Sequence, residues 1–401
     1  MGTKKNTIVV INAGSSSIKF AVYGIDGKLE KLSYGAINGI QQADVVGTLT
    51  NCSSKAKKTF TVSHGDFLSA TQALVYVLNE EYDMNVVAIG HRVVHGGSRY
   101  SRTTKITDEV FSHLQDIVSL DPDHMPSALI LMRELNRMWP DAQHVACFDT
   151  AFFRDMPRIA RIIPLPRRFE QMGVKRYGFH GLSYEYVQSQ FEQFAGPAAA
   201  SGRVIYAHLG SGASLTATLN RRPMDTTMGF SPASGIVMST RSGDLDPTIG
   251  GFLEKTHHMS AADYSRVVNQ ESGLLGVSGT SADMYTLLQR EHDDVRAAEA
   301  VQLFCYQVRK AIGSLSAVLG GLDSLVFTGG IGEQSALIRT RICSELGYLG
   351  VSLDYHKNEQ AASLISSEGS AVGVHVISTD ESKIIAEEVY VYINQHSGER
   401  E

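Results

Sequence analysis

Long apolar runs are missing from this 401-residue chain. No stretch reaches the roughly 18 apolar residues that a membrane-spanning helix needs. The apolar run after the basic N-terminus covers only Ile8 to Ile11, which is too short for a signal peptide. Position 6 is asparagine, so the myristoylation pattern after Gly2 fails as well. We therefore expect a cytoplasmic protein with no membrane partner.

Basic charge and paired cysteines are also scarce. The net charge of −6 argues against a nucleic-acid partner, for which a basic surface is expected. The chain has no Cys-x-x-Cys pair, which argues against a metal knuckle or a redox motif. Its few cysteines are widely spaced and are expected to be buried free thiols in a reducing compartment: Cys52, Cys147, Cys305 and Cys343.

What the sequence does contain is a repeated opening. Strand-like segments at Thr7–Ile11 and Ile18–Tyr23 flank a loop of small polar residues, 12–17. The same order recurs later, with strands at 203–209 and 215–219 around Gly210 to Ser214. A chain of this length fits two domains, and we expect boundaries at 1–150 and 151–381, with a C-terminal helix at about 382–401 packing back on the first.

Three glycine- or serine-rich segments each follow a predicted strand directly. They are 12–17 (followed by Lys19), 208–214, and Gly329-Gly330-Ile331-Gly332-Glu333 after a strand at 324–328. Small residues let backbone N–H groups approach phosphate oxygens. One such loop is more often a simple turn, and no Walker loop is present, but three favour a site for the phosphates of a nucleotide.

Charged side chains complete the pattern. Arg92 closes a short strand in Gly-His-Arg-Val-Val-His-Gly-Gly, and Arg241 lies in a long loop near 225–246. A planar guanidinium suits the charge that develops on a transferring phosphoryl group, although a single arginine could equally form a surface ion pair. Asp149 ends another strand, where it could hold Mg²⁺ or cap a helix. His180 lies between two glycines, and the residues around it leave a structural role open.

Together these segments resemble the acetate and propionate kinase family, of the acetate/sugar kinase–actin–heat-shock ATPase superfamily. The resemblance extends from Asn12 to about Ile385 and rests on matching segments in the same order: 11–19, 90–97, 146–151, 174–181, 207–214, 225–232, 240–246, 271–279 and 327–333. It implies an α/β protein with a duplicated ribonuclease-H-like (actin-like ATPase) fold, two domains and an active-site cleft between them. It also implies a homodimer.

The resemblance assigns roles residue by residue. Arg92, Asp149, His180 and Arg241 would be catalytic. Asn12, Asp149 and Glu381 would organise Mg²⁺, or Mn²⁺ in its place. The acid would be bound by Arg92, Val94, His124, Phe179 and Pro232. ATP or ADP would be bound by Ser17, Lys19, His208, Leu209, Gly210, Ser211, Gly212, Asp283, Gly329, Gly330, Ile331 and Gly332.

The predicted reaction is reversible, magnesium-dependent transfer of a phosphoryl group between ATP and acetate, in line and without a covalent intermediate. The nucleophile is already an anion, so positioning and charge neutralisation would carry the catalysis. A kinase for propionate or a hydroxylated acid, or one using pyrophosphate as donor, stays open. A nucleotide-binding protein without catalysis is a third hypothesis.

The chain departs from the family pattern at several positions. Asp123 stands where the acyl pocket usually has leucine, so either it turns to solvent or the pocket accepts a more polar acid. Ser211 replaces the usual asparagine, and Tyr285 replaces an arginine on the nucleoside side. The other departures are Phe153 for His, Ser234 for Glu, Ser382 for the second Glu of a pair, and Gly181-Leu182-Ser183-Tyr184 for Gly-Thr-Ser-His.

Overall fold

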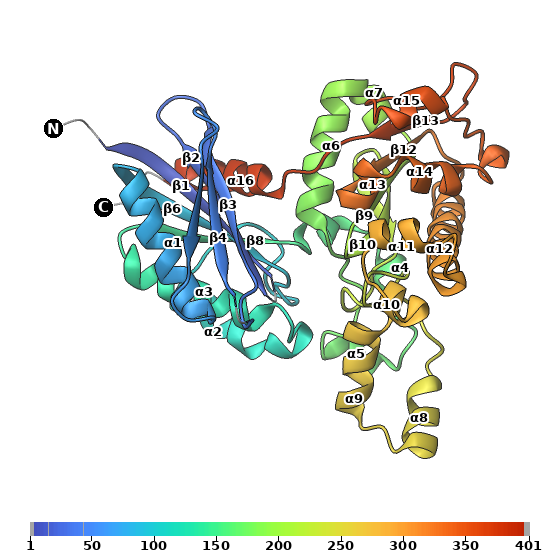
Figure 1. Cartoon of the computed structure of the whole chain (residues 1–401), viewed down its shortest axis with the longest axis horizontal. Coiled ribbons are helices and arrows are strands. Elements are labelled where there is room, and N and C mark those ends of the chain that lie inside the picture. Colours follow the sequence, from blue (N-terminus) through green and yellow to red (C-terminus); the bar gives the residue numbers. More distant parts are fainter. Residues whose placement is uncertain (1–3, 15, 43, 397–401) are drawn as a thin grey trace. The chain divides into compact units, whose positions relative to one another are not determined.

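The structure, a computed structural model, describes residues 4–14, 16–42 and 44–396 and divides them into two units. Unit one comprises residues 4–151 and 380–396, and unit two comprises residues 152–379. Each unit is built on its own mixed β-sheet with helices packed against it (Figure 1). Within the described ranges, no helix is both long enough and apolar enough to cross a bilayer.

The elements of unit one are β1 (Lys5–Ala13), β2 (Ser17–Gly24), β3 (Glu30–Asn38), β4 (Val46–Asn51), β5 (Lys57–Thr61), α1 (Phe67–Glu81), β6 (Met84–Val93), β7 (Thr104–Lys105), α2 (Asp108–Asp116), η1 (Val118–Leu120), α3 (Met125–Met138), β8 (Gln143–Phe148) and α16 (Glu381–Gln395). The short helix η2 (Ala151–Asp155) follows at the boundary. The predicted C-terminal helix thus corresponds to α16, and residues 397–401 of that prediction lie outside the described residues.

The elements of unit two are α4 (Arg158–Arg161), α5 (Arg167–Gln171), α6 (Gly181–Ala195), α7 (Pro197–Ala200), β9 (Val204–Leu209), β10 (Ala213–Leu219), β11 (Arg222–Thr226), α8 (Ile249–His257), α9 (Ala261–Arg266), η3 (Val267–Glu271), α10 (Gly273–Ser278), α11 (Met284–Arg290), α12 (Val295–Leu319), β12 (Ser324–Thr328), α13 (Gly329–Gln334), α14 (Ala336–Cys343), η4 (Gly347–Leu349), α15 (Tyr355–Glu359) and β13 (Gly373–Val376).

The two sheets share one five-stranded pattern. Unit one has the order β5-β4-β3-β2-β1-β6-β8-β7, and unit two has β11-β10-β9-β12-β13. In unit one, β1 pairs antiparallel with β2 and parallel with β6, and β6 pairs parallel with β8. In unit two, β9 pairs antiparallel with β10 and parallel with β12, and β12 pairs parallel with β13. The repeat expected from the two strand–loop–strand segments is therefore a repeat of the whole sheet core.

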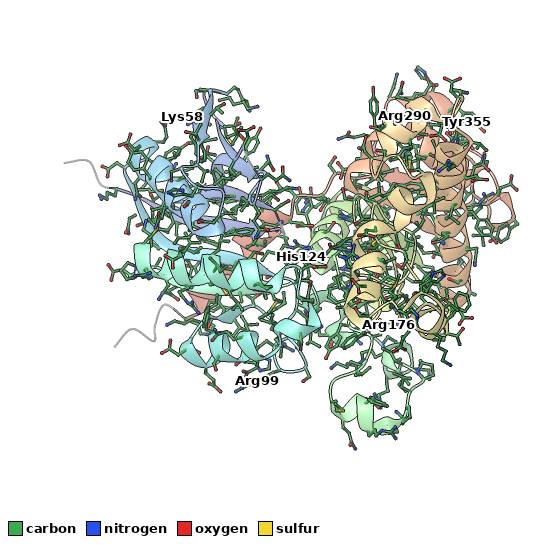
Figure 2. All side chains as sticks on the ribbon, turned by 60° about the horizontal axis from the view of Figure 1, so that its bottom comes forward. Lys58, Arg99, His124, Arg176, Arg290 and Tyr355 are labelled. Carbon is green, nitrogen blue, oxygen red and sulfur yellow. The ribbon has the colours of Figure 1, made fainter. Side chains whose placement is uncertain are left out.

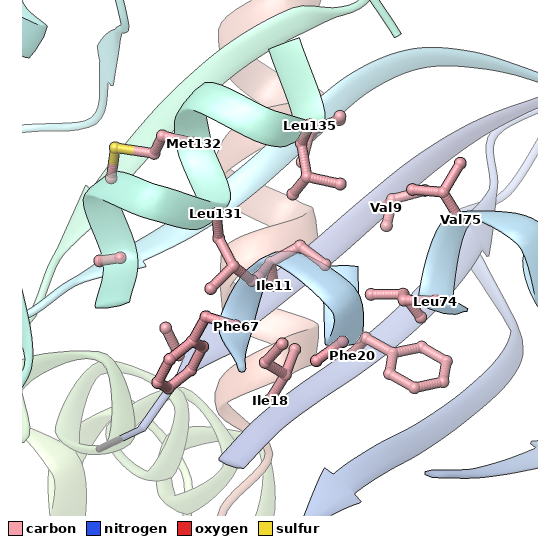
Figure 3. Close-up of a cluster of buried hydrophobic side chains, with 14 of the residues drawn as sticks. Val9, Ile11, Ile18, Phe20, Phe67, Leu74, Val75, Leu131, Met132 and Leu135 are labelled. Atoms are coloured by element: carbon pink, nitrogen blue, oxygen red, sulfur yellow. The ribbon is translucent and has the colours of Figure 1, made fainter. Parts of the chain in front are cut away.

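Alternation along the strands decides which residues of unit one enter the core. Val9 and Ile11 of β1 pack on α1 and α3, together with Ile18 and Phe20 of β2 (Figure 3). Side chains alternate across a strand, so the neighbouring residue Asn12 points to the opposite face. There its side chain meets Glu381, the first residue of α16. The long apolar strands are covered on both faces, as expected for the parallel part of a sheet.

The third glycine-rich segment is not the loop that the sequence suggested. Gly329 to Gln334 form the short helix α13, directly after β12. Glycine has a low helix propensity, but tertiary contacts stabilise this helix. The Glu333 carboxylate accepts from the Gly329 N–H at 2.9 Å, and the buried Arg339 donates to the carbonyls of Gly332 and Glu333, both at 2.8 Å.

Close packing of α16 on β6 gives a first prediction. A Cβ at Gly90 would lie 2.7 Å from Ile385 Cγ2 and 2.9 Å from Val389 Cγ2. We expect Gly90→Ala to lower the free energy of unfolding by about 1–3 kcal/mol through overpacking. Urea unfolding followed by fluorescence of the single tryptophan, Trp139 in unit one, measures it. Adding Ile385→Leu, which removes the Cγ2 methyl, should restore part of the loss; no restoration would contradict the packing argument.

A buried histidine pair gives a second prediction. His91 Nε2 lies 3.0 Å from His144 Nδ1. Burial, reinforced by His144, holds the pKa of His91 well below its usual value, and burial lowers the pKa of His144 to about 4. Both residues are therefore neutral when folded and take up protons on unfolding. Their contribution to stability is complete above pH 6.5 and is lost as the pH falls toward 4, by about 1.4 kcal/mol per pH unit for each proton.

Trp139 fluorescence in urea at pH 7, 6 and 5 measures this loss. His144→Gln should flatten the pH dependence, while His64→Gln, at an exposed histidine of the same unit, should leave it as in the native chain. Equal slopes in all three proteins would show that other groups cause the acid destabilisation.

Candidate active site

Three neighbouring strands of unit one bring polar residues to one edge of the sheet. β1, β6 and β8 run parallel, so their carboxyl ends lie together. Asn12 is the penultimate residue of β1, Arg92 is the penultimate residue of β6, and Asp149 directly follows β8. In open α/β sheets this edge is where ligands usually bind.

The Arg92 guanidinium holds this group together. Its Nε donates to the Asp149 carboxylate at 3.1–3.2 Å, and its Nη2 donates to Asp149 Oδ2 at 2.5 Å. Its Nη1 donates to Asn12 Oδ1 at 3.0 Å, and Asn12 Nδ2 donates to Glu381 Oε2 at 3.1 Å. The structure therefore brings together four residues that the resemblance assigns to catalysis and metal binding.

Burial makes the charges of this cluster interact strongly. The Asp149 side chain is 1% exposed, and those of Arg92 and Glu381 are 16% and 20% exposed. Burial alone would lower the pKa of Arg92, but the attraction of Asp149 and Glu381 outweighs it and raises that pKa. Burial also raises the pKa of Asp149; Arg92 opposes this rise, and the Glu381 carboxylate adds to it. The two carboxylates thus carry more negative charge than one arginine offsets.

His124 lies next to this cluster, at the start of α3 (Figure 2). Its Nδ1 is 3.0–3.1 Å from both carboxylate oxygens of the buried Asp121, three residues earlier. The charge of Asp121 contributes to the raised pKa of Arg92, which ties the two groups together. Asp123, by contrast, is exposed. The first of the two readings of this departure, a side chain turned to solvent, agrees with that exposure.

The remaining predicted residues of unit one occupy different positions. Ser17 closes the turn after β1, where the Gly14 N–H donates to the Ser17 carbonyl at 2.8 Å. Lys19 pairs in register with Asn12, so both side chains lie on the face that α16 covers, and Lys19 is exposed. Val94 follows β6 and is buried.

In unit two, His180 occupies an unusual backbone conformation. Its φ of 60° is left-handed, which is uncommon for a residue other than glycine. The preceding Gly178 also has positive φ, and a Cβ there would lie 2.5 Å from the Phe153 ring. Phe153, which replaces the family's histidine, therefore packs against the turn that presents His180. Phe179 between them is buried.

His180 and Arg241 converge on the second glycine loop. A Cβ at Gly212 would lie 3.1 Å from His180 Nε2 and 3.6 Å from Arg241 Nη1. The His180 ring stacks on that of His208, with centroids 4.3 Å apart, and its Nδ1 lies 2.9 Å from Ser214 Oγ. Arg241 Nη1 also donates to the Pro232 carbonyl at 3.3 Å.

Backbone hydrogen bonds fix the turn that carries Arg241. The Met238 N–H donates to the Arg241 carbonyl at 3.0 Å, and the Ser239 N–H donates to the Ser211 carbonyl at 3.1 Å. Gly273, at the start of α10, has positive φ, and a Cβ there would lie 2.2 Å from the Met238 carbonyl oxygen. The arginine turn is thus held between α10 and the second glycine loop.

A cavity of about 930 Å³ opens beside these groups in unit two. Seven predicted residues line it: Gly210, Ser211, Gly212, Arg241, Asp283, Gly330 and Ile331. Its other lining residues are Ser239, Thr240, Ala282, Met284, Tyr285, Leu288, Gln289, Glu291, His292, Gln334, Ser335, Ala336 and Leu337. The predicted residues His208, Leu209, Gly329 and Gly332 do not line it; the last three are buried where β9 meets α13.

Sequence reasoning did not anticipate the side-chain partners of His124 in unit one and of His180 in unit two. Asp121 contacts His124, and Ser214 and Tyr184 stand behind His180. A signal existed for Ser214: a hairpin around 209–213 places it opposite His208, as the register confirms. Nothing in the sequence alone marked Tyr184 as more than a departure from the family pattern.

Similarity to solved structures defines the class of protein. The propionate kinase from Francisella tularensis subsp. tularensis SCHU S4 superposes with a TM-score of 0.89 and 33% sequence identity, covering 96% of this chain and 98% of that one. The protein is therefore an α/β kinase of the two-domain actin-like ATPase fold, a phosphotransferase with a carboxyl group as acceptor. The predicted fold class and enzyme class are confirmed.

Sequence similarity then gives the family. Residues 7–387 match the Acetokinase family. The acetate kinase of Rhodopseudomonas palustris (strain TIE-1) is 40% identical over 393 residues, 96% of this chain and 98% of the relative. The propionate kinase of Citrobacter rodentium (strain ICC168) is 40% identical over 389 residues, 95% of this chain and 96% of the relative. This chain belongs to the Acetokinase family.

The approach of His180 and Arg241 to Gly212 gives a third prediction. In Gly212→Ala, the new methyl would push His180 Nε2 away by a few tenths of an ångström and would lie in van der Waals contact with Arg241 Nη1, so we expect the phosphoryl-transfer kcat to fall roughly 10- to 100-fold while the melting temperature stays close to that of the native protein. Gly251→Ala is the control, because a Cβ at Gly251 meets no atom within 4 Å. A Gly212→Ala enzyme with native kcat would show that this approach does not matter.

Proposed function

We propose that this protein is an acetate kinase, which transfers a phosphoryl group reversibly between ATP and acetate with Mg²⁺. The observation that carries the proposal is the convergence of His180 Nε2 and Arg241 Nη1 on Gly212, at the edge of the unit-two cavity. A hydrogen-bond donor and a guanidinium that meet over a glycine loop suit a transferring phosphoryl group, whose charge spreads over several oxygens.

The cavity supports a nucleotide, rather than pyrophosphate, as phosphoryl donor. At about 930 Å³ it lies within the range of roughly 300–1,000 Å³ that is usual for small-molecule sites. Its glycine side is polar, while Met284, Tyr285 and Leu337 give the far side apolar surface. Pyrophosphate would use only the polar side. We assign the phosphates to Gly210, Ser211, Gly212, Gly330 and Ile331, and the nucleoside to the side of Asp283 and Tyr285.

The unit-one cluster supports a divalent cation. Asp149 and Glu381 supply carboxylate oxygens and Asn12 an amide oxygen, the hard donors that Mg²⁺ prefers. Burial raises the pKa of Asp149 and the Glu381 carboxylate adds to this rise, and a cation would offset the negative charge of the two carboxylates. Among the described residues, no group of three or more His, Cys, Asp or Glu could hold a metal ion by itself, so water and phosphate oxygens would complete the coordination shell. When bound, Mg²⁺ supplies positive charge to the phosphate oxygens.

The residues of the chain then have simple roles. Arg92 binds the carboxylate of the acid and is held in place by Asp149 and Asn12. Arg241 and His180 bind the oxygens of the transferring group. Acetate attacks in line through its own carboxylate oxygen, so no side chain has to remove a proton. His124, oriented by Asp121, and the apolar residues Val94, Phe179 and Pro232 would contact the acid.

Propionate is the second candidate, because the acetate and propionate kinases named above are equally identical to this chain at 40%. Small aliphatic and aromatic residues at the proposed acyl positions suit either alkyl chain. The exposed Asp123 weighs against a hydroxylated acid, since it gives such a pocket no charge. A homodimer, which rests on the resemblance alone, and a cytoplasmic location, expected from the sequence, complete the proposal.

Acyl hydroxamate formation from MgATP and hydroxylamine tests the function. Acetate, propionate, butyrate and glycolate are offered in parallel, each with the native enzyme and with Arg241→Ala. We expect the highest turnover on acetate and a loss of about 10²–10³-fold in kcat for the variant, because it removes one donor to the transition state.

Arg222→Ala, at an exposed arginine of β11, is the matched control and should keep native kcat. Preference for another acid would keep the mechanism and change the substrate. No turnover on any acid, with ATP or pyrophosphate, or in reverse with acetyl phosphate and ADP, would refute the enzyme and leave a nucleotide-binding protein.

A further inference from the structure

Two hydroxyl groups lie in line behind His180 in unit two. Ser214 Oγ, on β10, is 2.9 Å from His180 Nδ1. The Tyr184 hydroxyl, one turn into α6, is 2.5 Å from the same Ser214 Oγ. Tyr184 and Ser214 are both fully buried, so solvent does not compete for these hydrogen bonds.

The direction of these hydrogen bonds follows from the donors available. Burial raises the pKa of Tyr184 well above its usual value, so the phenol keeps its proton throughout the working pH range. Ser214 Oγ, 2.5 Å away, is the hydroxyl that faces the buried phenol, so the phenol proton is directed to Ser214. A hydroxyl that accepts from the phenol cannot donate back to it, so the Ser214 proton is directed to its other neighbour, His180 Nδ1. A neutral imidazole that accepts at Nδ1 carries its own proton on Nε2.

We propose that Tyr184 and Ser214 form a hydroxyl relay that holds His180 in the tautomer with its proton on Nε2. Tyr184 and Ser214 are positioning residues, because they act through His180. The Nε2 edge is the one that faces Gly212 and Arg241. The relay therefore presents an N–H donor toward the glycine loop, and this part of the inference rests on the proposed function.

Contacts of the neighbouring His208 restrict the orientation of the His180 ring. The stacked His208 is bound at Nδ1 by Ser183 Oγ at 2.8 Å, and Ser183 is 2.8 Å from Thr379 Oγ1. These contacts fix the plane of the His180 ring but not the nitrogen that bears its proton. The contact at Nδ1, which bears on the tautomer, is the one with Ser214 Oγ.

NMR of the full chain, labelled with ¹⁵N in its histidine rings, tests the relay directly. Long-range ¹H–¹⁵N correlations distinguish the two neutral tautomers, and a His180→Asn sample assigns the signal among the 14 histidines. We expect the Nε2–H pattern in the native enzyme without substrate. In Tyr184→Phe the Ser214 proton loses its direction, and the signal should move toward the Nδ1–H pattern.

Kinetics give a second readout. Loss of one neutral orienting hydrogen bond should lower kcat about 3- to 10-fold, with KM for the acid within about twofold. Ser214→Ala should give a similar loss, and the double variant should lose no more than either single one, since both act on one relay. Tyr206→Phe is the control: Tyr206 is equally buried, but its hydroxyl lies beside Thr218, so tautomer and kcat should be native.

An Nδ1–H pattern in the native enzyme would overturn the proposal, and so would a Tyr184→Phe spectrum identical to the native one. The spectra need no substrate. They therefore decide about the relay even if hydroxamate formation shows that the protein acts on no carboxylic acid.

Discussion

The buried ion pair between Arg92 and Asp149 is the interaction on which unit one depends. It joins the ends of β6 and β8, and through Asn12 and Glu381 it reaches β1 and the start of α16. A buried guanidinium is tolerated only when its donors are satisfied, and removing one partner of such a pair typically costs about 3–5 kcal/mol. Residues 380–396, far away in sequence, belong to this unit because α16 covers the sheet face on which these side chains lie.

The same arrangement explains why the proposed cation site is also a structural element. Two carboxylates and one arginine leave net negative charge in a place that water hardly reaches. Folding alone would favour replacing such a cluster with apolar residues. Its retention is understandable if a cation and phosphate oxygens share the site during the reaction, because then each charge has a partner.

Local sequence patterns predicted those helices and strands whose stability depends on residues close to them in the sequence. Helix α12 has buried apolar residues at three- and four-residue spacing, which the sequence shows directly (Val301, Phe304, Val308, Ile312 and Leu315); it begins after the capping Asp294 and ends before Gly320, which has positive φ. The strands around the first two polar loops were also predicted, because alternation and small residues mark them. Helix α13 was not predicted, because glycine-rich sequence favours a loop and its stability comes from Arg339, bound by Asn358 nineteen residues away. Hydrogen bonds between a buried arginine and a residue far away in the sequence leave no periodic pattern in the sequence.

The candidate site divides in the same way. Strand ends made Arg92 and Asp149 candidates without any family knowledge, since a charged residue after an apolar strand is conspicuous. A surface ion pair or a helix cap stayed open for them, and their roles came from the resemblance. Asp121, Ser214 and Tyr184 were missed because they contact other polar side chains rather than substrate. Residues with a hydroxyl group, and aspartates a few residues from a histidine, are common in any sequence. Only the structure shows which of them contact the histidine.

The departures from the family pattern are compatible with the chemistry because most of these residues pack or form hydrogen bonds locally. Phe153 exchanges a polar ring for an apolar one against Gly178 and keeps the left-handed turn before His180. Ser234 accepts from the Gly229 N–H at 2.7 Å, and Ser382 donates to Asp380 at 2.6 Å, so each small hydroxyl has a local role. Tyr184 differs from these because its hydroxyl reaches His180 through one serine. Burial holds the pKa of the Tyr184 phenol well above its usual value, so this hydroxyl stays protonated near neutral pH and remains available as a donor to Ser214.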